Sequence, residues 1–305
     1  MRASLHALTA ELKRLKASGV KSLPVSDASL AQLRAAIAGR SSGGQPAAAV
    51  VAAAATPIRT TPVEYKPPAR TFVAKPVAVP ATTLPSPTPF TLPAGDKAAR
   101  WAALRERVLN DPVCRANVRP GKQVVMGVGS LDAKIMFVGE APGAEEEVQG
   151  EPFVGPAGQL LNKMIGATGL KRADVYIGNI MNWRPQMPAD ASGVQYGNRP
   201  PTPEELAYCL PYLKAQIEVV SPELLVALGS TAAQGLLGVG TFKALGEVRG
   251  RWKEFAGKPL MVTYHPSYIL RNQSNQSKRL IWEDLLKVME RAALPISDKQ
   301  RGFFL

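Results

Sequence analysis

Four side chains capable of acid–base or hydrogen-bonding chemistry each follow a short apolar stretch of the sequence. Glu140 lies in the turn GEAPG, Glu146 lies in the acidic run behind it, and Asn179 and His265 follow two further apolar stretches. A carboxylate can orient water, an imidazole can donate or accept a proton, and a carboxamide can both donate and accept hydrogen bonds. Singly, they could equally be a solvated acidic run, a turn amide and a structural histidine. Their order along the chain is what indicates a site.

Strands and helices alternate from residue 134 onwards. Strands are expected at residues 134–138, 175–178, 224–228 and 259–264, and helices at residues 158–168, 203–220 and 278–292. The helix at 203–220 opens with Thr202 as a cap and Pro203 in its first turn. Short buried strands joined by helices predict a parallel sheet covered on both faces. Ligands of such sheets bind beyond the carboxyl ends of the strands, so the four groups should meet at one edge.

Composition predicts one compact domain behind a long N-terminal region. Residues 41–95 hold 11 of the 27 prolines and few large side chains, which is typical of a disordered linker, here rich in Ala, Pro and Thr. Residues 1–40 contain two short helix candidates, at 4–16 and 26–39. The compact domain is expected at residues 96–305. No apolar run is long enough for a membrane helix, and two cysteines suit a reducing cytoplasm.

The charge is unevenly distributed. The chain carries a net charge of +13, of which residues 1–100 contribute 13 Lys/Arg against 4 Asp/Glu. A basic segment of this kind can act as an electrostatic tether for nucleic acid, and it can equally be a solvated linker without a specific partner.

Six motifs in a fixed order carry a family resemblance. They are GEAPGAEEE, PFVGPAGQLL, VYIGNIMNWRP, NRPPTPEE, ALGSTAA and HPSYILR. Together they resemble the uracil-DNA glycosylase superfamily, specifically its family 4, over about residues 113–291. The resemblance implies a three-layer α/β/α sandwich around a four-stranded parallel sheet, in agreement with the strand and helix pattern.

The resemblance also implies roles for individual residues. Glu140 would activate water, with Glu146 in a second position. Phe153 would stack on an everted base, Asn179 would hydrogen-bond the uracil edge, and His265 would stabilise the leaving base. The further residues implied in binding substrate or DNA are Gly139, Ala141, Gly143, Ser230, Ser267, Leu270 and Arg271, of which Leu270 or Arg271 would enter the duplex as a wedge.

The implied function is a DNA repair glycosylase that acts by base flipping. It would evert uracil from DNA and hydrolyse the N-glycosidic bond, leaving an abasic site, and we expect a cytoplasmic monomer. Two alternatives stay open: a damaged-DNA binding module with little catalysis, and a glycosylase of broader base range. The second arises because Gly143 stands where family 1 relatives carry a ring that excludes thymine.

Two features depart from the resemblance. Many family 4 members hold an iron–sulfur cluster with four cysteines, whereas only Cys114 and Cys209 are present here and Trp183 stands in place of the third. We therefore expect neither a cluster nor any other metal or cofactor. Residues 186–196 form an insertion without histidine, so we expect ordinary turnover rather than covalent trapping of substrate.

Overall fold

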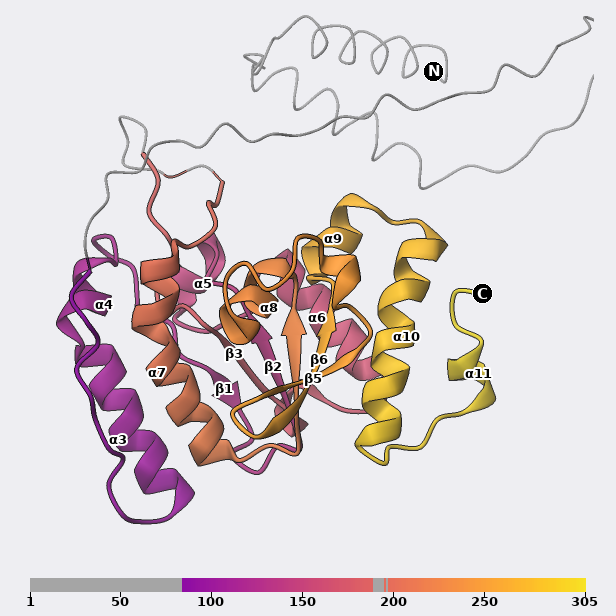
Figure 1. The fold of residues 1–305 in the computed structure, drawn as a ribbon, viewed down its shortest axis with the longest axis horizontal. Coiled ribbons are helices and arrows are strands. Elements are labelled where there is room, and N and C mark those ends of the chain that lie inside the picture. The colour runs from indigo at the N-terminus through magenta and orange to yellow at the C-terminus, as the bar shows by residue number, and fades with distance from the viewer. Residues whose placement is uncertain (1–83, 189–194, 196) are drawn as a thin grey trace, which may run out of the picture. The chain divides into compact units, whose positions relative to one another are not determined.

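The computed structural model describes residues 84–188, 195 and 197–305 (Figure 1). The helix candidates at 4–16 and 26–39 and most of the predicted linker lie outside the described residues. The chain divides into two units, Met1–Pro76 and Val77–Leu305, and all described residues belong to the second.

The second unit is built on a six-stranded sheet in the order β1-β3-β2-β4-β6-β5. The strands are β1 (Val128–Gly129), β2 (Ile135–Gly139), β3 (Tyr176–Asn179), β4 (Leu224–Leu228), β5 (Trp252–Phe255) and β6 (Lys258–Thr263). The four central strands are parallel, as predicted, whereas β1 and β5 pair antiparallel at the two edges. The prediction of a purely parallel four-stranded sheet is therefore incomplete. It missed β1 because that strand has only two residues, and β5 because its WKEF pattern is half-exposed and polar.

Nine helices are assigned among the described residues. They are α3 (Lys97–Asn110), α4 (Pro112–Ala116), α5 (Ala144–Gln149), α6 (Pro156–Ala167), α7 (Pro203–Val220), α8 (Ser230–Leu237), α9 (Pro266–Arg271), α10 (Asn275–Arg291) and α11 (Asp298–Arg301). The cap predicted for α7 is confirmed, since the Thr202 side chain accepts a hydrogen bond from the Glu205 backbone N–H. Among the described residues, none of the helices combines the length and apolarity needed to cross a membrane.

Alternating strand residues place a core on each face of the sheet. In β2, Met136 and Val138 pack in the cluster that contains residues of α3, α7 and α8, whereas Ile135 and Phe137 pack in the cluster that contains residues of α6 and α10. Figure 1 shows α3 and α7 on one side of the strands and α6 and α10 on the other. This period of two is what burial on both faces requires, and it confirms the three-layer arrangement.

The folded unit begins earlier than the composition suggests. Leu84, Phe90 and Leu92 pack against the core, and the Phe90 ring lies 5.5 Å from the Tyr212 ring. The Arg107 guanidinium lies 4.4 Å from the centroid of the Phe90 ring. Residues 84–95, which the sequence assigned to the linker, therefore contribute apolar contacts to the domain.

Removal of residues 1–83 tests the electrostatic tether without disturbing this packing. The deletion takes away 11 Lys/Arg and 3 Asp/Glu. We expect the slope of log affinity for uracil-containing DNA against log salt to fall by about 0.9 for each phosphate that the shortened protein no longer neutralises. Turnover on short oligonucleotides should stay nearly unchanged, because the predicted site residues all lie between residues 139 and 271. An unaltered salt slope in a binding titration would refute the tether.

Candidate active site at the carboxyl ends of the parallel strands

The sheet register brings the candidate residues to one edge. Gly139 at the end of β2 lies directly opposite Asn179 at the end of β3. In the neighbouring pair of strands, Leu228 of β4 lies opposite Thr263 of β6, and His265 follows Thr263 by two residues. Figure 1 shows α5, α8 and α9 gathered beyond this end of the sheet. The chain segments that leave the four strands therefore start side by side.

Phe153, Asn179 and His265 converge above Gly139. A Cβ atom built on Gly139 would lie 2.3 Å from Asn179 Oδ1 and 2.6 Å from two carbons of the Phe153 ring. The Phe153 ring centroid lies 5.6 Å from that of the His265 imidazole, with the two planes inclined by 32°. The structure thus brings an aromatic ring close to a carboxamide and to an imidazole at one edge of the sheet, although their roles in catalysis stay predictions.

The backbone around Phe153 is held in an uncommon conformation. Phe153 has a φ of +54°, in the left-handed region that non-glycine residues seldom adopt. Its carbonyl oxygen would lie 1.8 Å from a Cβ at Gly158, so only glycine fits there at the start of α6. Arg172 donates to the carbonyl oxygens of both Pro152 and Phe153, at 2.6 and 3.2 Å. Strain of this kind persists where surrounding contacts determine it, and it is common at functional sites.

Asn179 carries a buried acceptor without a partner. The residue is only 6% exposed, and its Oδ1 has no hydrogen-bond partner among the described residues. Leaving a buried polar group unpaired costs about 1–3 kcal/mol. A ligand with an N–H group directed at Oδ1 would recover this free energy.

Glu140 lies beside the first turn of α8. Its side chain hydrogen-bonds the Thr231 hydroxyl, while its backbone carbonyl accepts from the Met181 N–H at 3.1 Å. Burial raises the pKa of Glu140, and the hydrogen bond from Thr231 offsets part of that rise. A raised pKa makes the carboxylate a better acceptor for a proton from water. Thr231 was not identified from the sequence as a partner of Glu140.

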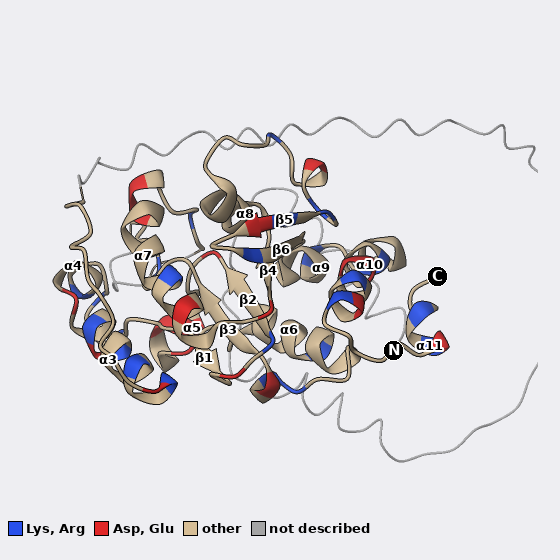
Figure 2. Ribbon diagram, turned by 60° about the horizontal axis from the view of Figure 1, so that its bottom comes forward, with Lys and Arg blue, Asp and Glu red and all other residues tan. Residues whose placement is uncertain are grey.

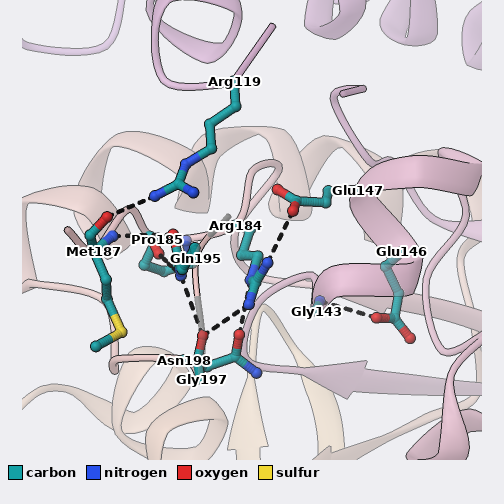
Figure 3. A network of polar contacts seen from close by, with 10 residues as sticks. All are labelled: Arg119, Gly143, Glu146, Glu147, Arg184, Pro185, Met187, Gln195, Gly197 and Asn198. Atoms are coloured by element: carbon teal, nitrogen blue, oxygen red, sulfur yellow. Dashed lines mark hydrogen bonds and ion pairs between the residues drawn. The ribbon is translucent and has the colours of Figure 1, made fainter. Parts of the chain in front are cut away.

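Glu146 holds two loops together. Its Oε2 accepts from the Gly143 N–H at 3.0 Å, and its Oε1 accepts from the N–H groups of Val154 and Gly155, each at 3.0 Å. Figure 3 shows the contact with Gly143. Both oxygens are thus engaged by backbone donors in a residue that is 8% exposed. The catalytic role predicted for Glu146 is untested, and these contacts favour positioning of the GEAPG turn against the Phe153 loop.

The contacts of His265 leave its neutral imidazole with an Nε2–H group that can donate a hydrogen bond. Its Nδ1 accepts from the Ser267 N–H at 3.2 Å and lies 2.9 Å from the Ser267 hydroxyl, so the proton of the neutral ring is on Nε2. Burial, followed by the positive charge of Arg271, lowers the pKa of His265 to about 4. Gly229, with φ of +95°, lets the start of α8 approach, because a Cβ there would lie 3.0 Å from the His265 Cβ.

The remaining predicted residues lie in α8, in α9 and in the GEAPG turn. Ser230 is exposed as the first residue of α8, and Leu270 and Arg271 are exposed at the end of α9. Ala141 is half-buried and packs against the core, so its side chain faces the protein interior. Ser267 hydrogen-bonds His265, and its predicted contact with DNA stays a prediction.

A buried ion pair between Arg184 and Glu147 of α5 was not predicted from the sequence. Arg184 Nη1 donates to Glu147 Oε1 at 2.8 Å, with side-chain exposures of 6% and 9%. Its other donors reach Asn198 Oδ1 at 2.8 Å and the Gly197 carbonyl at 2.7 Å, as Figure 3 shows. Arg184 thereby ties α5 to the end of the insertion. The only signal for it was an arginine within the WRP motif.

The two cysteines do not fit a four-cysteine iron–sulfur cluster. Cys114 and Cys209 are buried free thiols, and a hydrogen bond between them together with burial raises the pKa of Cys114. Trp183 is fully buried beside Tyr208, with ring centroids 6.1 Å apart. Among the described residues, no group of three or more His, Cys, Asp or Glu side chains could hold a metal ion.

Comparisons with known proteins indicate the family of this chain. The family described as the uracil DNA glycosylase superfamily matches residues 126–286, more than half of the chain. A type-4 uracil-DNA glycosylase of Thermotoga maritima is 43% identical over 183 residues, which cover 60% of this chain and 89% of that protein. The type-4 enzyme of Archaeoglobus fulgidus is 43% identical over 48% of this chain and 71% of its own length. A type-5 uracil-DNA glycosylase of Thermus thermophilus is 29% identical over 66% of this chain and 94% of its own length. The chain belongs to the uracil-DNA glycosylase superfamily.

The lowered pKa of His265 gives a direct test of its surroundings. The imidazole should titrate near pH 4 in the folded protein and near its ordinary value of about 6.5 when unfolded. Between these values the unfolded state binds a proton that the folded state does not, so stability falls as pH decreases from 6.5 to 4. The chain has two histidines, so NMR titration of the His6→Gln variant isolates the signal of His265. A midpoint near 6.5 in the folded protein would contradict the buried, neutral imidazole.

Proposed function

We propose that this protein excises uracil from DNA, leaving an abasic site for repair. The observation that carries the proposal is the unpaired buried Oδ1 of Asn179, which lies beside Gly139 together with the ring of Phe153. The centroid of that ring lies 5.6 Å from the centroid of the His265 imidazole. Relatives named type-4 uracil-DNA glycosylase support the same activity. Two buried free cysteines suit a reducing cytoplasm, where we expect the protein to act as a monomer.

Recognition of uracil follows from the chemistry of the carboxamide. Asn179 can accept from N3–H of uracil and donate to O4, whereas cytosine presents the reverse pattern at these positions. A base within a duplex is inaccessible, so it must be everted at a cost of a few kcal/mol. Stacking on Phe153 offsets part of this cost, since base–aromatic stacking contributes about 1–3 kcal/mol.

Bond cleavage requires stabilisation of a departing anion and an attacking water. As the bond between C1′ and N1 breaks, its electron pair passes to the uracil ring, and negative charge develops on O2. The Nε2–H of His265 would donate to this oxygen, which stabilises the transition state more than the ground state. Glu140 would orient the water that attacks C1′ and accept its proton.

The same site also bears on which bases other than uracil the protein could excise. A Cβ at position 143 would lie 2.5 Å from Glu146 Oε2, so a ring at this position would displace the carboxylate that holds the two loops. Thymine is therefore not excluded by a side chain at residue 143. This observation favours a broader base range as the alternative to strict uracil specificity.

Three single variants test the proposed chemistry. Asn179→Ala, His265→Ala and Glu140→Gln should each lower single-turnover excision, and loss of one transition-state donor such as His265 typically costs about 10²–10³-fold in rate. The measurement is a gel assay on matched uracil-containing and thymine-containing oligonucleotides. Lys163→Gln, at an exposed position of α6, serves as the control and should behave like the wild type. Tight binding of uracil DNA without abasic product would instead establish a binding module.

We further propose that the protein works without an iron–sulfur cluster. Trp183 and Tyr208 fill space beside the two remaining cysteines, so apolar packing replaces the ligands there. Protein purified with and without oxygen should lack iron and visible absorbance. A Cys114→Ala variant, with one thiol removed, should contain equally little iron. Stoichiometric iron in the wild type, absent from this variant, would overturn the proposal.

A further inference from the structure

A hollow lies at the β1 edge of the sheet. It has a volume of about 620 Å³ and lies between α3, α4, the segment that leads into β1, and the chain that follows α5. Neither Phe153, Asn179, His265 nor Glu140 lines it. It is therefore distinct from the candidate active site, and nothing in the proposed chemistry uses it.

The lining of this hollow is strongly basic. Arg105, Arg115, Arg119 and Lys122 line it, against the single carboxylate of Glu151. Residues 84–305 carry 26 Lys/Arg and 21 Asp/Glu, a net charge of +5. The four cations and one carboxylate of the hollow have a net charge of +3. Figure 2 shows Lys and Arg segments along α3, one wall of the hollow. Cations gathered in a hollow raise the local concentration of anions.

Two of these cations are available for a ligand. The side chains of Arg115 and Lys122 have no hydrogen-bond or ion-pair partner within the part of the chain that the structure describes, although both backbones are hydrogen-bonded. Arg115 is exposed, and Lys122 is half-buried. Their charges are therefore not neutralised by the protein itself.

The hollow also presents a fixed aromatic ring. Trp101 lines it and is half-buried, and its Nε1 donates to the hydroxyl of the fully buried Tyr176 at 3.0 Å. The guanidinium of Arg105 lies 5.9 Å from the indole centroid. A ring held in place beside cations suits a ligand that combines a flat heterocycle with a phosphate, which is a nucleotide.

The hollow is joined to the active site through α5. The Gln123 N–H donates to the Glu147 carbonyl at 2.7 Å, and Gln123 Nε2 donates to the Val148 carbonyl at 2.7 Å. Gly150 and Glu151 line the hollow, and Phe153 follows two residues later. One continuous loop therefore borders both sites.

We propose that this hollow binds a nucleotide of the same DNA strand, outside the everted uracil. The inference rests on the proposed function, because that activity brings a strand to the neighbouring pocket. A strand crossing from one site to the other would place its phosphates against Arg115 and Lys122 and a base or sugar against Trp101. The hollow then adds affinity for longer substrates and leaves the chemical step unchanged.

The test compares two double variants in the full-length protein. Arg115→Gln/Lys122→Gln removes two cations from the hollow, and Arg251→Gln/Lys253→Gln removes two exposed cations at β5, the opposite edge of the sheet. For a uracil oligonucleotide of about 25 nucleotides, the first variant should lower the salt slope of binding by about 1.4–1.8, and the second should leave it unchanged. For one of about 5 nucleotides, shorter than many single-strand binding sites, both variants should excise uracil at the wild-type rate.

The outcomes separate this inference from the proposed function. If both variants excise uracil but share the salt slope of the wild type, the hollow does not bind the strand. If thymidine monophosphate binding weakens in the first variant while DNA binding does not, the hollow serves a free nucleotide, which also overturns the inference. Absence of excision by the wild type would refute the proposed function instead.

Discussion

The absence of a side chain at position 139 is the constraint on which the candidate site depends. The parallel register sets Gly139 opposite Asn179, and any Cβ at 139 would collide with both the Asn179 carboxamide and the Phe153 ring. These two side chains can therefore approach the end of β2 only because this residue is glycine. Gly158 likewise lets α6 start against the backbone of Phe153, and Gly229 lets α8 start close to His265.

Two consecutive glutamates, Glu146 and Glu147, hold the loops that border the candidate site. Glu146 accepts three backbone hydrogen bonds that link the GEAPG turn to the Phe153 loop, and Glu147 pairs with Arg184 at the end of the insertion. Burying a carboxylate is costly unless hydrogen bonds or an opposite charge compensate for its lost hydration. Both residues satisfy this condition, so the acidic run serves as a structural junction and Glu145 alone of the three is exposed.

The region around Cys114 and Cys209 is packed with aromatic side chains. Trp183 and Tyr208 pack together, and the hydroxyls of Tyr208 and Tyr212 both donate to Asp111, at 2.9 and 2.7 Å to its Oδ2. These contacts join the start of α4 to α7. The basic hollow lies along the same side of the domain, lined by residues of α3 and α4. This side therefore combines an aromatic core with a surface suited to anions.

Local patterns in the sequence determined most of the fold. Apolar runs of strand length, the Thr202 cap and the Gly- and Pro-rich turns each depend on near neighbours, so the four parallel strands and the order of the site residues could be predicted. The two edge strands could not, because β1 and β5 owe their conformation to pairing with β3 and β6 and have little apolar pattern of their own. Composition also placed residues 84–95 in the linker, whereas their few apolar side chains pack on the core.

For the site, the sequence supplied Glu140, Phe153, Asn179 and His265 as residue types at the ends of strands. Only the tertiary structure decided which atoms remain free to act. It engaged both oxygens of Glu146 with backbone donors, turned Ser267 towards His265, and left Oδ1 of Asn179 unpaired. The physical reason is that hydrogen-bond satisfaction and burial depend on residues distant in sequence, and folding alone brings those residues together.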